Sequence, residues 1–211
     1  MRLCAQMTLL PSNVGYAEEA DACLKRYESR SSEDMHADWI HLFPKTPCKV
    51  LDVGAGTGRD AAWLAGLGHH VVAAEPTAQL REPAKTLHPD PNIKWLDDIL
   101  PELKAVRARN ETYDLILMNA VWMHLTEQER ERGMEVVSSL MAPGARWFLT
   151  LRHGPVPEGR RMFNVTGNET GALAEPHGLA CIFNQTSESI QPENRARGIS
   201  WTKVILERPA L

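Results

Sequence analysis

Five short apolar runs that alternate with stretches of helical periodicity constrain the fold of this chain more than any other feature. We predict strands over Val50–Val53, Val71–Ala74, Ile93–Leu96, Leu115–Asn119 and Trp147–Leu151. We predict helices over Arg59–Leu67, Ala78–Leu87, Leu100–Arg109 and Glu127–Met141, and Pro83 predicts a kink or an early end in the second of them. Strands that alternate with crossover helices form a parallel sheet that is covered on both faces.

The last sixty or so residues depart from this alternation. A short helix over Glu169–Glu175 precedes two strand-like runs, Leu179–Asn184 and Ile199–Leu206, which a polar loop over Gln185–Arg197 joins. Two adjacent runs without a helix between them predict an antiparallel hairpin at a sheet edge. We therefore expect an α/β, Rossmann-like fold with a mostly parallel seven-stranded sheet and an antiparallel C-terminal hairpin strand.

The first part of the chain is predicted to be helical. Apolar residues recur at helical spacing within residues 16–43, and the polar stretch Glu28–Ser32 divides them into two helices, the second capped by Ser31 or Ser32. We assign residues 1–47 to a helical cap or lid segment and residues 48–211 to the α/β domain, within a single domain overall. Tyr16, Tyr27 and Trp39 either cover a ligand from this cap or pack in the core.

Composition limits where such a chain acts and what it binds. The 211 residues are 43% hydrophobic and 24% charged, which is typical of one folded domain. The apolar runs are too short to span a membrane, and four scattered cysteines without a C-x-x-C pair predict a reduced, cytoplasmic protein. The net charge of −4 argues against a protein whose affinity comes from nucleic-acid phosphates.

A glycine-rich turn follows the first strand, at Gly54-x-Gly56-x-Gly58. Glycines there allow the backbone to approach a ligand closely. The second strand ends in Glu75, 17 residues past Gly58, where an acid can accept both hydroxyls of a ribose. The dinucleotide pattern G-x-G-x-x-G is not matched, because Arg59 occupies the position of its third glycine.

These motifs resemble those of the class I S-adenosylmethionine (SAM)-dependent methyltransferases. The resemblance covers about residues 48–153 and rests on Asp52–Gly58, Glu75, Trp95–Ile99 and Asp114–Asn119. It is strongest to the broad bacterial group that acts on small molecules. It implies SAM as the cofactor and S-adenosylhomocysteine as its product, bound at the carboxyl ends of the parallel strands.

The resemblance also implies roles for the glycine-rich turn. Asp52 would order the turn and help to hold the ammonium group of the cofactor. Gly54, Ala55 and Gly56 would pass under its methionine portion and ribose.

The later motifs would bind the rest of the cofactor. Glu75 would take the ribose hydroxyls, with Pro76 beside the adenine. Asp98 would accept from the adenine amino group, and the Ile99 backbone N–H would meet a ring nitrogen. The backbone carbonyl of Asn119 would face the ammonium and sulfonium end.

The residues that follow the fourth strand are candidates for the acceptor side. Methyl transfer from a sulfonium needs in-line alignment at about 3 Å and, for some nucleophiles, removal of a proton. His124 is a candidate general base, and the alternative is that it packs and hydrogen-bonds behind the cofactor. Trp122 is a candidate acceptor contact, and the alternative is core packing.

Arginines after the fifth strand suggest an anionic acceptor. Arg152, with Arg160 and Arg161 close behind, offers guanidinium groups that bind a carboxylate or phosphate bidentately. We list Arg152 as a catalytic and substrate-binding candidate and Arg161 as a substrate-binding candidate, against the alternative of solvated surface arginines. Arg195 and Arg197 lie before the last strand and are open to the same two interpretations.

The sequence thus predicts a SAM-dependent methyltransferase that acts on a small, possibly acidic metabolite, with no metal and no membrane partner. Two alternatives stay open. One is an RNA or protein methyltransferase, and the other is a SAM-binding protein with non-methylating chemistry. The sequence leaves the oligomeric state undetermined.

Overall fold

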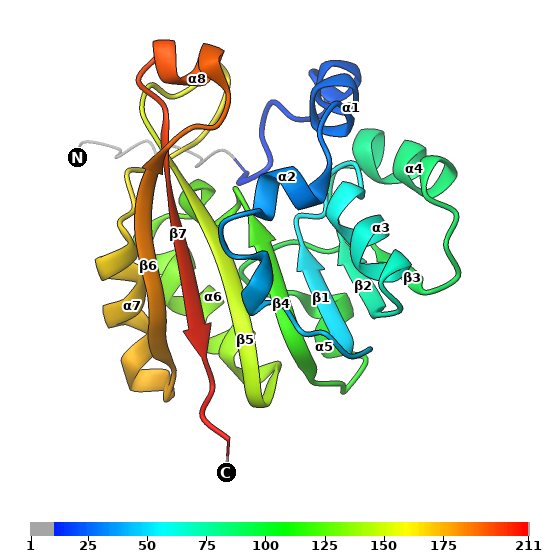
Figure 1. The fold of residues 1–211 in the computed structure, drawn as a ribbon, viewed down its shortest axis with the longest axis vertical. Coiled ribbons are helices and arrows are strands. Elements are labelled where there is room, and N and C mark those ends of the chain that lie inside the picture. The colour runs from blue at the N-terminus through cyan, green and yellow to red at the C-terminus, as the bar shows by residue number, and fades with distance from the viewer. Residues whose placement is uncertain (1–10, 211) are drawn as a thin grey trace, which may run out of the picture.

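The computed structural model describes residues 11–210, which contain one seven-stranded sheet (Figure 1). The strands lie in the order β3-β2-β1-β4-β5-β7-β6. Strands β1 to β5 pair in parallel, and β7 runs antiparallel to both β5 and β6. The predicted fold class is confirmed. The strand bounds are β1 Lys49–Val53, β2 His70–Ala74, β3 Ile93–Leu96, β4 Tyr113–Asn119, β5 Met141–His153, β6 Ala180–Glu188 and β7 Ser200–Glu207.

Alternate side chains of the central strands feed two separate hydrophobic clusters, one on each face of the sheet. Leu51 and Ile116 belong to the cluster that includes residues of α5 (Lys104–Arg107), α6 (Glu127–Ser139) and α7 (Gly167–Ala174). Val50 and Leu117 belong to the cluster that includes Trp39 and residues of α3 (Arg59–Gly66). This two-residue period explains why the strands read as continuous apolar runs, because both of their faces are buried.

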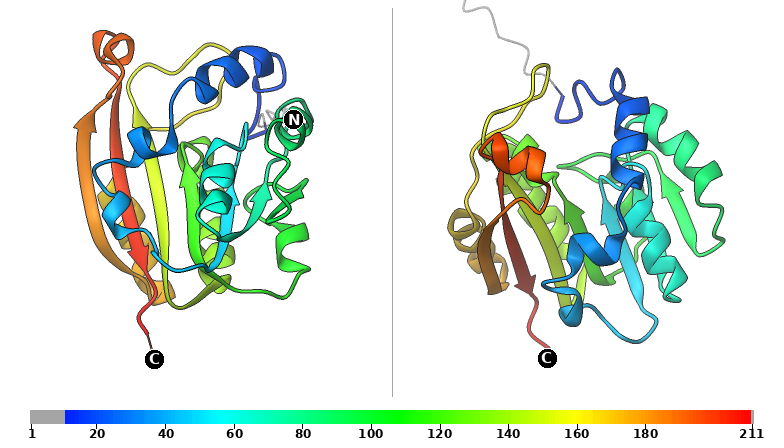
Figure 2. Two further views of the ribbon diagram at one scale, coloured as in Figure 1. Left: turned by 45° about the vertical axis from the view of Figure 1, so that its right-hand side comes forward. Right: turned by 45° about the horizontal axis from the view of Figure 1, so that its top comes forward.

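The cap segment contains α1 (Ala20–Glu28), α2 (Ser32–His36) and the 3-10 turn η1 (Ile40–Leu42). The predicted division between two helices is confirmed, and the Ser31 side chain caps α2 by accepting from the Asp34 N–H at 3.1 Å. In Figures 1 and 2, α1 lies at the end of the sheet toward which β1, β4 and β5 point.

Two further predictions about helices need correction. Helix α4 (Ala78–Leu87) continues through Pro83, so the early end is not found; Leu80 and Ala84 are buried on either side of the proline. The helix predicted over Leu100–Arg109 is only the single turn of α5, because Leu103 before it has a φ of +43° and lies outside the helical region.

The polar loop predicted over Gln185–Arg197 is also different in the structure. Strand β6 continues to Glu188, which pairs with Ser200, and α8 (Pro192–Ala196) forms the tip of the hairpin. Strand β6 is an edge strand with mostly exposed side chains, so its polar residues cost little there and give no apolar signal. Two 3-10 turns, η2 (Trp122–His124) and η3 (Glu175–His177), complete the elements.

Three features are absent from residues 11–210. None of the helices is long and apolar enough to cross a membrane. Cys23, Cys48 and Cys181 are free thiols, and Cys4 lies outside the described residues. Histidine, cysteine and acidic side chains do not gather there in any group of three or more that could hold a metal ion.

Candidate active site

A cleft of about 520 Å³ lies at the carboxyl ends of β1, β4 and β5, between the sheet and the cap. Its lining includes every residue that the sequence assigned to the cofactor. These are Asp52, Gly54, Ala55, Gly56, Glu75, Pro76, Asp98, Ile99 and Asn119. The parallel order of the strands brings these separate motifs to one edge of the sheet.

In the glycine-rich turn, Gly54 packs tightly against a neighbouring side chain, whereas Gly56 has open space beside it. Gly54 has a φ of +70°, and a Cβ there would lie 2.4 Å from Val121 Cγ2. Gly56 has a φ of +57°, but a Cβ there would meet no atom closer than the Gly54 carbonyl oxygen at 3.9 Å. The structure therefore demands glycine at both positions for backbone reasons, and Gly56 leaves space for a ligand above the turn.

The Glu75 carboxylate is held at the floor of the cleft by backbone N–H groups. Gly56 N–H donates to Oε2 at 2.8 Å, and Thr77 N–H donates to Oε1 at 2.7 Å. Burial raises the pKa of Glu75, and these two hydrogen bonds partly oppose that shift. Each oxygen keeps a free lone pair, so the carboxylate can still accept from two hydroxyl groups.

Asp52 is a buried acidic side chain in the lining of the cleft. Its side chain is buried, and Oδ2 has no hydrogen-bond partner. Burial and the nearby Asp60 carboxylate raise the pKa of Asp52 well above its ordinary value. An unpartnered buried carboxylate is costly, so a positively charged ligand group at this position would be favoured.

The Asp98 carboxylate already accepts two backbone hydrogen bonds. Ile99 N–H donates to Oδ1 at 3.0 Å, and Val106 N–H donates to Oδ2 at 2.8 Å. In this structure the Ile99 N–H is therefore not available to an adenine ring nitrogen. The Ile99 side chain is partly exposed at the cleft, where it offers an apolar surface.

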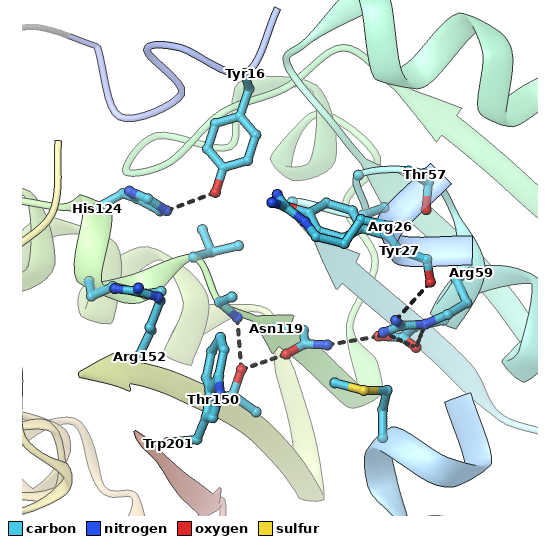
Figure 3. A pocket seen from close by; sticks show the side chains of 18 of the residues that line it. Tyr16, Arg26, Tyr27, Thr57, Arg59, Asn119, His124, Thr150, Arg152 and Trp201 are labelled. Carbon is cyan, nitrogen blue, oxygen red and sulfur yellow. Dashed lines mark hydrogen bonds and ion pairs between the residues drawn. The ribbon is translucent and has the colours of Figure 1, made fainter. Parts of the chain in front are cut away.

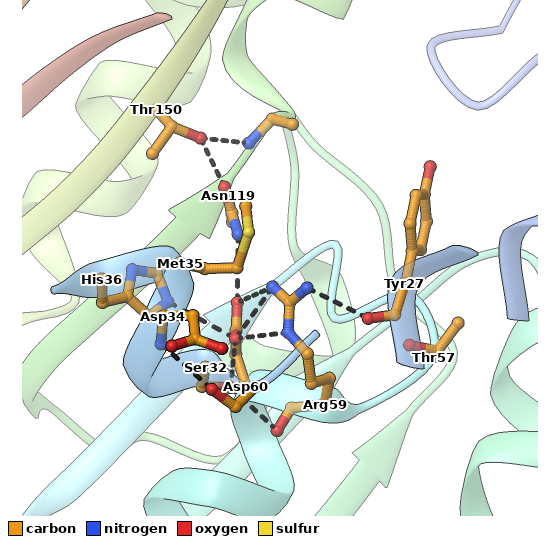
Figure 4. Close-up of polar contacts among 12 residues, drawn as sticks. Tyr27, Ser32, Asp34, Met35, His36, Thr57, Arg59, Asp60, Asn119 and Thr150 are labelled. Carbon is orange, nitrogen blue, oxygen red and sulfur yellow. Dashed lines mark hydrogen bonds and ion pairs between the residues drawn. The ribbon is translucent and has the colours of Figure 1, made fainter. Parts of the chain in front are cut away.

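Asn119, at the end of β4, belongs to a chain of hydrogen bonds (Figure 4). Its Nδ2 donates to Asp60 Oδ2 at 3.1 Å, and its Oδ1 accepts from the Thr150 hydroxyl at 2.5 Å. Thr150 Oγ1 in turn accepts from the Ala120 N–H at 2.8 Å. Ala120 has a φ of +60°, which is unusual for alanine, and these bonds hold it there.

Asp60 connects that chain to the cap. It accepts from the Ser32 hydroxyl at 2.7 Å and from Arg59 Nε at 3.0 Å, and His36 Nε2 lies 3.4 Å away. Burial alone would raise the pKa of Asp60, but His36 and Arg59 outweigh it and hold the pKa well below its ordinary value. Sequence reasoning missed Asp60, because all of its partners except Arg59 come from distant segments.

His124 and Tyr16 form a hydrogen-bonded pair on the other side of the cleft (Figure 3). The Tyr16 hydroxyl lies 3.0 Å from His124 Nε2, and His124 Nδ1 lies 2.6 Å from the Arg161 carbonyl oxygen. A carbonyl only accepts, so Nδ1 carries the proton and Nε2 accepts from Tyr16. Burial and the positive charge of Arg160 lower the pKa of His124, which favours the neutral imidazole.

Two arginines line the cleft near this pair. Arg152, next to last in β5, donates to the Pro155 carbonyl oxygen at 2.9 Å and has no carboxylate partner among the described residues. Burial and the nearby Arg197 lower the pKa of Arg152. The Arg160 guanidinium lies 3.4 Å from the centre of the Tyr16 ring and donates to Glu19 at 2.5 Å.

Two predicted acceptor contacts lie outside the cleft lining. Trp122 is fully buried in the core, where its ring packs edge-on against Trp147 with 5.3 Å between centres. Arg161 is buried and donates to the His124 carbonyl oxygen at 2.8 Å and to Glu129 at 2.5 Å. Arg161 thus supports His124 from behind, and Arg160 is the neighbour that faces the cleft.

Comparison with known proteins identifies the family. Residues 50–144 match the family model described as a methyltransferase domain. Over these residues the chain is a methyltransferase domain, and the comparisons support a class I SAM-dependent methyltransferase. SAM is the cofactor of this family.

Relatives of known name are more distant. An arsenite methyltransferase of Mus musculus is 29% identical over 141 residues, which cover 60% of this chain and 37% of the relative. The probable SAM-dependent methyltransferase TehB of Haemophilus influenzae is 27% identical over 135 residues, which cover 59% of this chain and 41% of the relative. The chain therefore spans about two fifths of the length of these relatives.

Solved structures match almost the whole chain. A TehB-like SAM-dependent methyltransferase from Corynebacterium glutamicum has a TM-score of 0.66 at 20% identity, covering 90% of this chain and 98% of the other. The 1,6-didemethyltoxoflavin-N1-methyltransferase of Burkholderia thailandensis, solved with bound 1,6-didemethyltoxoflavin and S-adenosylhomocysteine, has a TM-score of 0.61 at 18% identity, covering 99% of this chain and 98% of the other. At these identities the likeness shows the fold alone.

Proposed function

We propose that this protein transfers the methyl group of SAM to a small anionic metabolite by in-line displacement. The observation that carries the proposal is that one cleft contains an acidic and a basic side chain whose binding capacity is not fully used within the described residues. Asp52 is a buried acid whose Oδ2 has no hydrogen-bond partner, and Arg152 is a guanidinium without a carboxylate partner among the described residues. The first suits the ammonium group of SAM, and the second suits an anionic acceptor.

The residues present fit the cofactor. The open space above Gly56 leaves room for its chain, and the free lone pairs of Glu75 suit the ribose hydroxyls. Pro76 and the Ile99 side chain offer apolar surface for adenine. We keep Asp98 as the group facing the adenine amine and the Asn119 carbonyl as the group facing the ammonium. Bound SAM supplies a methyl group that its sulfonium already activates.

On the acceptor side, Arg152 would orient the anionic group of the acceptor, and neutral His124 would act as the general base. Arg161 would position His124 rather than contact the acceptor. Within the predicted cap of residues 1–47, the described part from residue 11 would exclude water from the cleft as a lid over the predicted domain of residues 48–211. A cytoplasmic location, predicted from the cysteine pattern, is part of the same proposal.

The direct experiment incubates the purified protein with methyl-labelled SAM and a cell extract separated into metabolites, RNA and protein. We expect label in the metabolite fraction, on a compound that an anion-exchange column retains. Label in RNA or protein instead would contradict the proposal. SAM binding by calorimetry with no label in any fraction would favour a SAM-binding protein with other chemistry.

Arg152→Gln then tests the anionic acceptor. We expect the KM for the labelled metabolite to rise by about tenfold to a hundredfold, as for loss of a charged hydrogen bond, with SAM affinity unchanged. The matched control is Arg107→Gln, because Arg107 is exposed on α5 and its one acidic partner among residues 11–210 is Glu102 at 3.6 Å. An unchanged KM in the Arg152 variant would exclude this role.

A further inference from the structure

Tyr16 is placed in the cleft by contacts between two distant segments. A Cβ on Gly15 would lie 2.8 Å from the Gly159 carbonyl oxygen, so residues 15 and 159 touch through their backbones. Next to this contact, Arg160 stacks over the Tyr16 ring at 3.4 Å and is held by Glu19 at 2.5 Å. The position of the Tyr16 ring is therefore fixed on one face by a buried guanidinium.

The hydroxyl of Tyr16 donates one hydrogen bond and can still accept another. It donates its only proton to His124 Nε2, since the Arg161 carbonyl fixes the other imidazole nitrogen as a donor. The phenol oxygen keeps its lone pairs, and no described residue donates to it. Figure 3 shows the hydroxyl at the edge of the open space that His124 and Arg152 also border. A protonated group entering that space would find an acceptor in Tyr16.

We propose that Tyr16 is a catalytic residue, which takes the proton of the acceptor's nucleophile while passing its own proton to His124. The nucleophile is therefore an O–H or N–H group, separate from the anionic group that Arg152 binds. This inference rests on the proposed function and narrows the substrate class to anionic metabolites that also carry a hydroxyl or amine.

The step balances in atoms and charge. The nucleophile forms a bond to the methyl carbon as the carbon–sulfur bond breaks, and the electron pair of that bond stays on sulfur. The nucleophile's proton moves to the Tyr16 oxygen, and the Tyr16 proton moves to His124 Nε2. One positive charge leaves the sulfonium and one appears on the imidazole, so the net charge of the cleft does not change. After product release the imidazolium returns its proton to water through Tyr16.

The electrostatics around the pair agree with this resting state. Burial raises the pKa of Tyr16 and outweighs the opposing charge of Arg160. Burial lowers the pKa of His124, with the charge of Arg160, and outweighs the opposing hydrogen bond to the Arg161 carbonyl. Both groups are thus neutral before the reaction, which is the state in which a tyrosine can relay a proton to histidine. A carboxylate or thiolate nucleophile has no proton to lose and would leave the pair without a role.

The test compares Tyr16→Phe with wild type in the labelled-SAM assay on the metabolite fraction, and measures SAM affinity by calorimetry. We expect label transfer at saturating acceptor to fall by about a hundredfold or more, with SAM affinity within threefold of wild type. Label transfer by His124→Gln should fall as far. Label transfer by the double variant should fall no further, because the two groups act as one unit. Tyr113→Phe, at the start of β4 in the core, is the matched control and should keep wild-type transfer.

The labelled product gives a second readout. A methyl ether or methylamine withstands mild alkali, whereas a methyl ester releases labelled methanol. Wild-type transfer by Tyr16→Phe, release of methanol by mild alkali, or a methyl group on sulfur would each overturn the relay while leaving methyl transfer intact. If the wild type labels no metabolite, the proposed function itself fails and the relay fails with it.

Discussion

The two sides of the cleft are built in different ways. On the cofactor side, short stretches of chain make the contacts, as where Glu75 accepts from Thr77 two residues away and from Gly56 nineteen residues away. On the acceptor side, the partners come from distant segments of the chain: Tyr16 and His124 are 108 residues apart, and Glu19 and Arg160 are 141 apart. In these examples, backbone N–H groups make the contacts on the cofactor side, and side chains make the contacts on the acceptor side.

The two sides also differ in charge. Asp52, Glu75 and Asp98 are acids on the cofactor side, and Arg152 and Arg160 are bases on the acceptor side. This arrangement suits a cationic cofactor opposite an anionic acceptor. The comparison teaches that the acceptor side can change without disturbing the backbone that holds the cofactor. Substitutions that act on one side, or on the link between them, test how far this separation goes.

Asp60→Asn should have the largest effect, because Asp60 links the cap to the end of β4. Removing its charge leaves Arg59 without its buried partner, which should cost about 3–5 kcal/mol of stability and weaken both binding functions. The folded pKa of Asp60 lies below its ordinary value of 3.8, so its contribution is present above about pH 4 and is lost as the pH falls further.

Denaturant unfolding from pH 7 to pH 3 measures both effects of Asp60→Asn. The wild type should lose stability toward pH 3 more steeply than the variant. Equal slopes, or a variant as stable as wild type at pH 7, would show that Asp60 does not couple the two sides.

Gly54→Ala should affect the cofactor side next most strongly. A left-handed φ costs alanine about 1–2 kcal/mol, and the clash with Val121 adds about 1–3 kcal/mol. We expect thermal unfolding to show that loss and calorimetry to show no SAM binding. Gly66→Ala, in α3 with no atom within 4 Å of the new Cβ, is the control and should gain up to about 1 kcal/mol. A variant at Gly54 that binds SAM normally would contradict the account of the turn.

Ser31→Ala should have the smallest effect. It removes the cap of α2 and should cost about 1 kcal/mol, measured by denaturant unfolding. Because the cap bond does not touch the cleft, SAM affinity should stay within twofold of wild type. A tenfold loss of SAM affinity would mean that α2 and the rest of the N-terminal segment control the cofactor side directly. The two sides of the cleft would then not be separable.

The same difference explains what could be predicted from sequence. The strands, the glycine-rich turn and the cofactor residues follow from local patterns, so Glu75 and Asn119 were found where the sheet places them. Trp122 was misplaced because η2 turns His124 toward the cleft and Trp122 into the core. Tyr16 contacts His124, and Asp60 contacts Ser32 and Asn119, which are far away in sequence, and no local pattern shows such contacts.

The most direct measurement of the central claim is a calorimetric titration of SAM into wild type, Asp52→Asn and Arg152→Gln, in buffers of different ionisation enthalpy. The raised pKa of Asp52 means that the folded protein holds a proton more tightly than the unfolded chain, so stability without SAM falls as the pH rises above 3.8. The ammonium group of SAM favours the ionised carboxylate. Any proton that Asp52 still holds should therefore leave on binding.

We predict that Asp52→Asn weakens SAM binding by about tenfold to a hundredfold and removes the Asp52 part of any proton release, while Arg152→Gln binds SAM as wild type does. The opposite pattern would contradict the account. If Asp52→Asn bound SAM normally, or Arg152→Gln lost as much affinity, the cofactor would not lie where the unpartnered carboxylate places it.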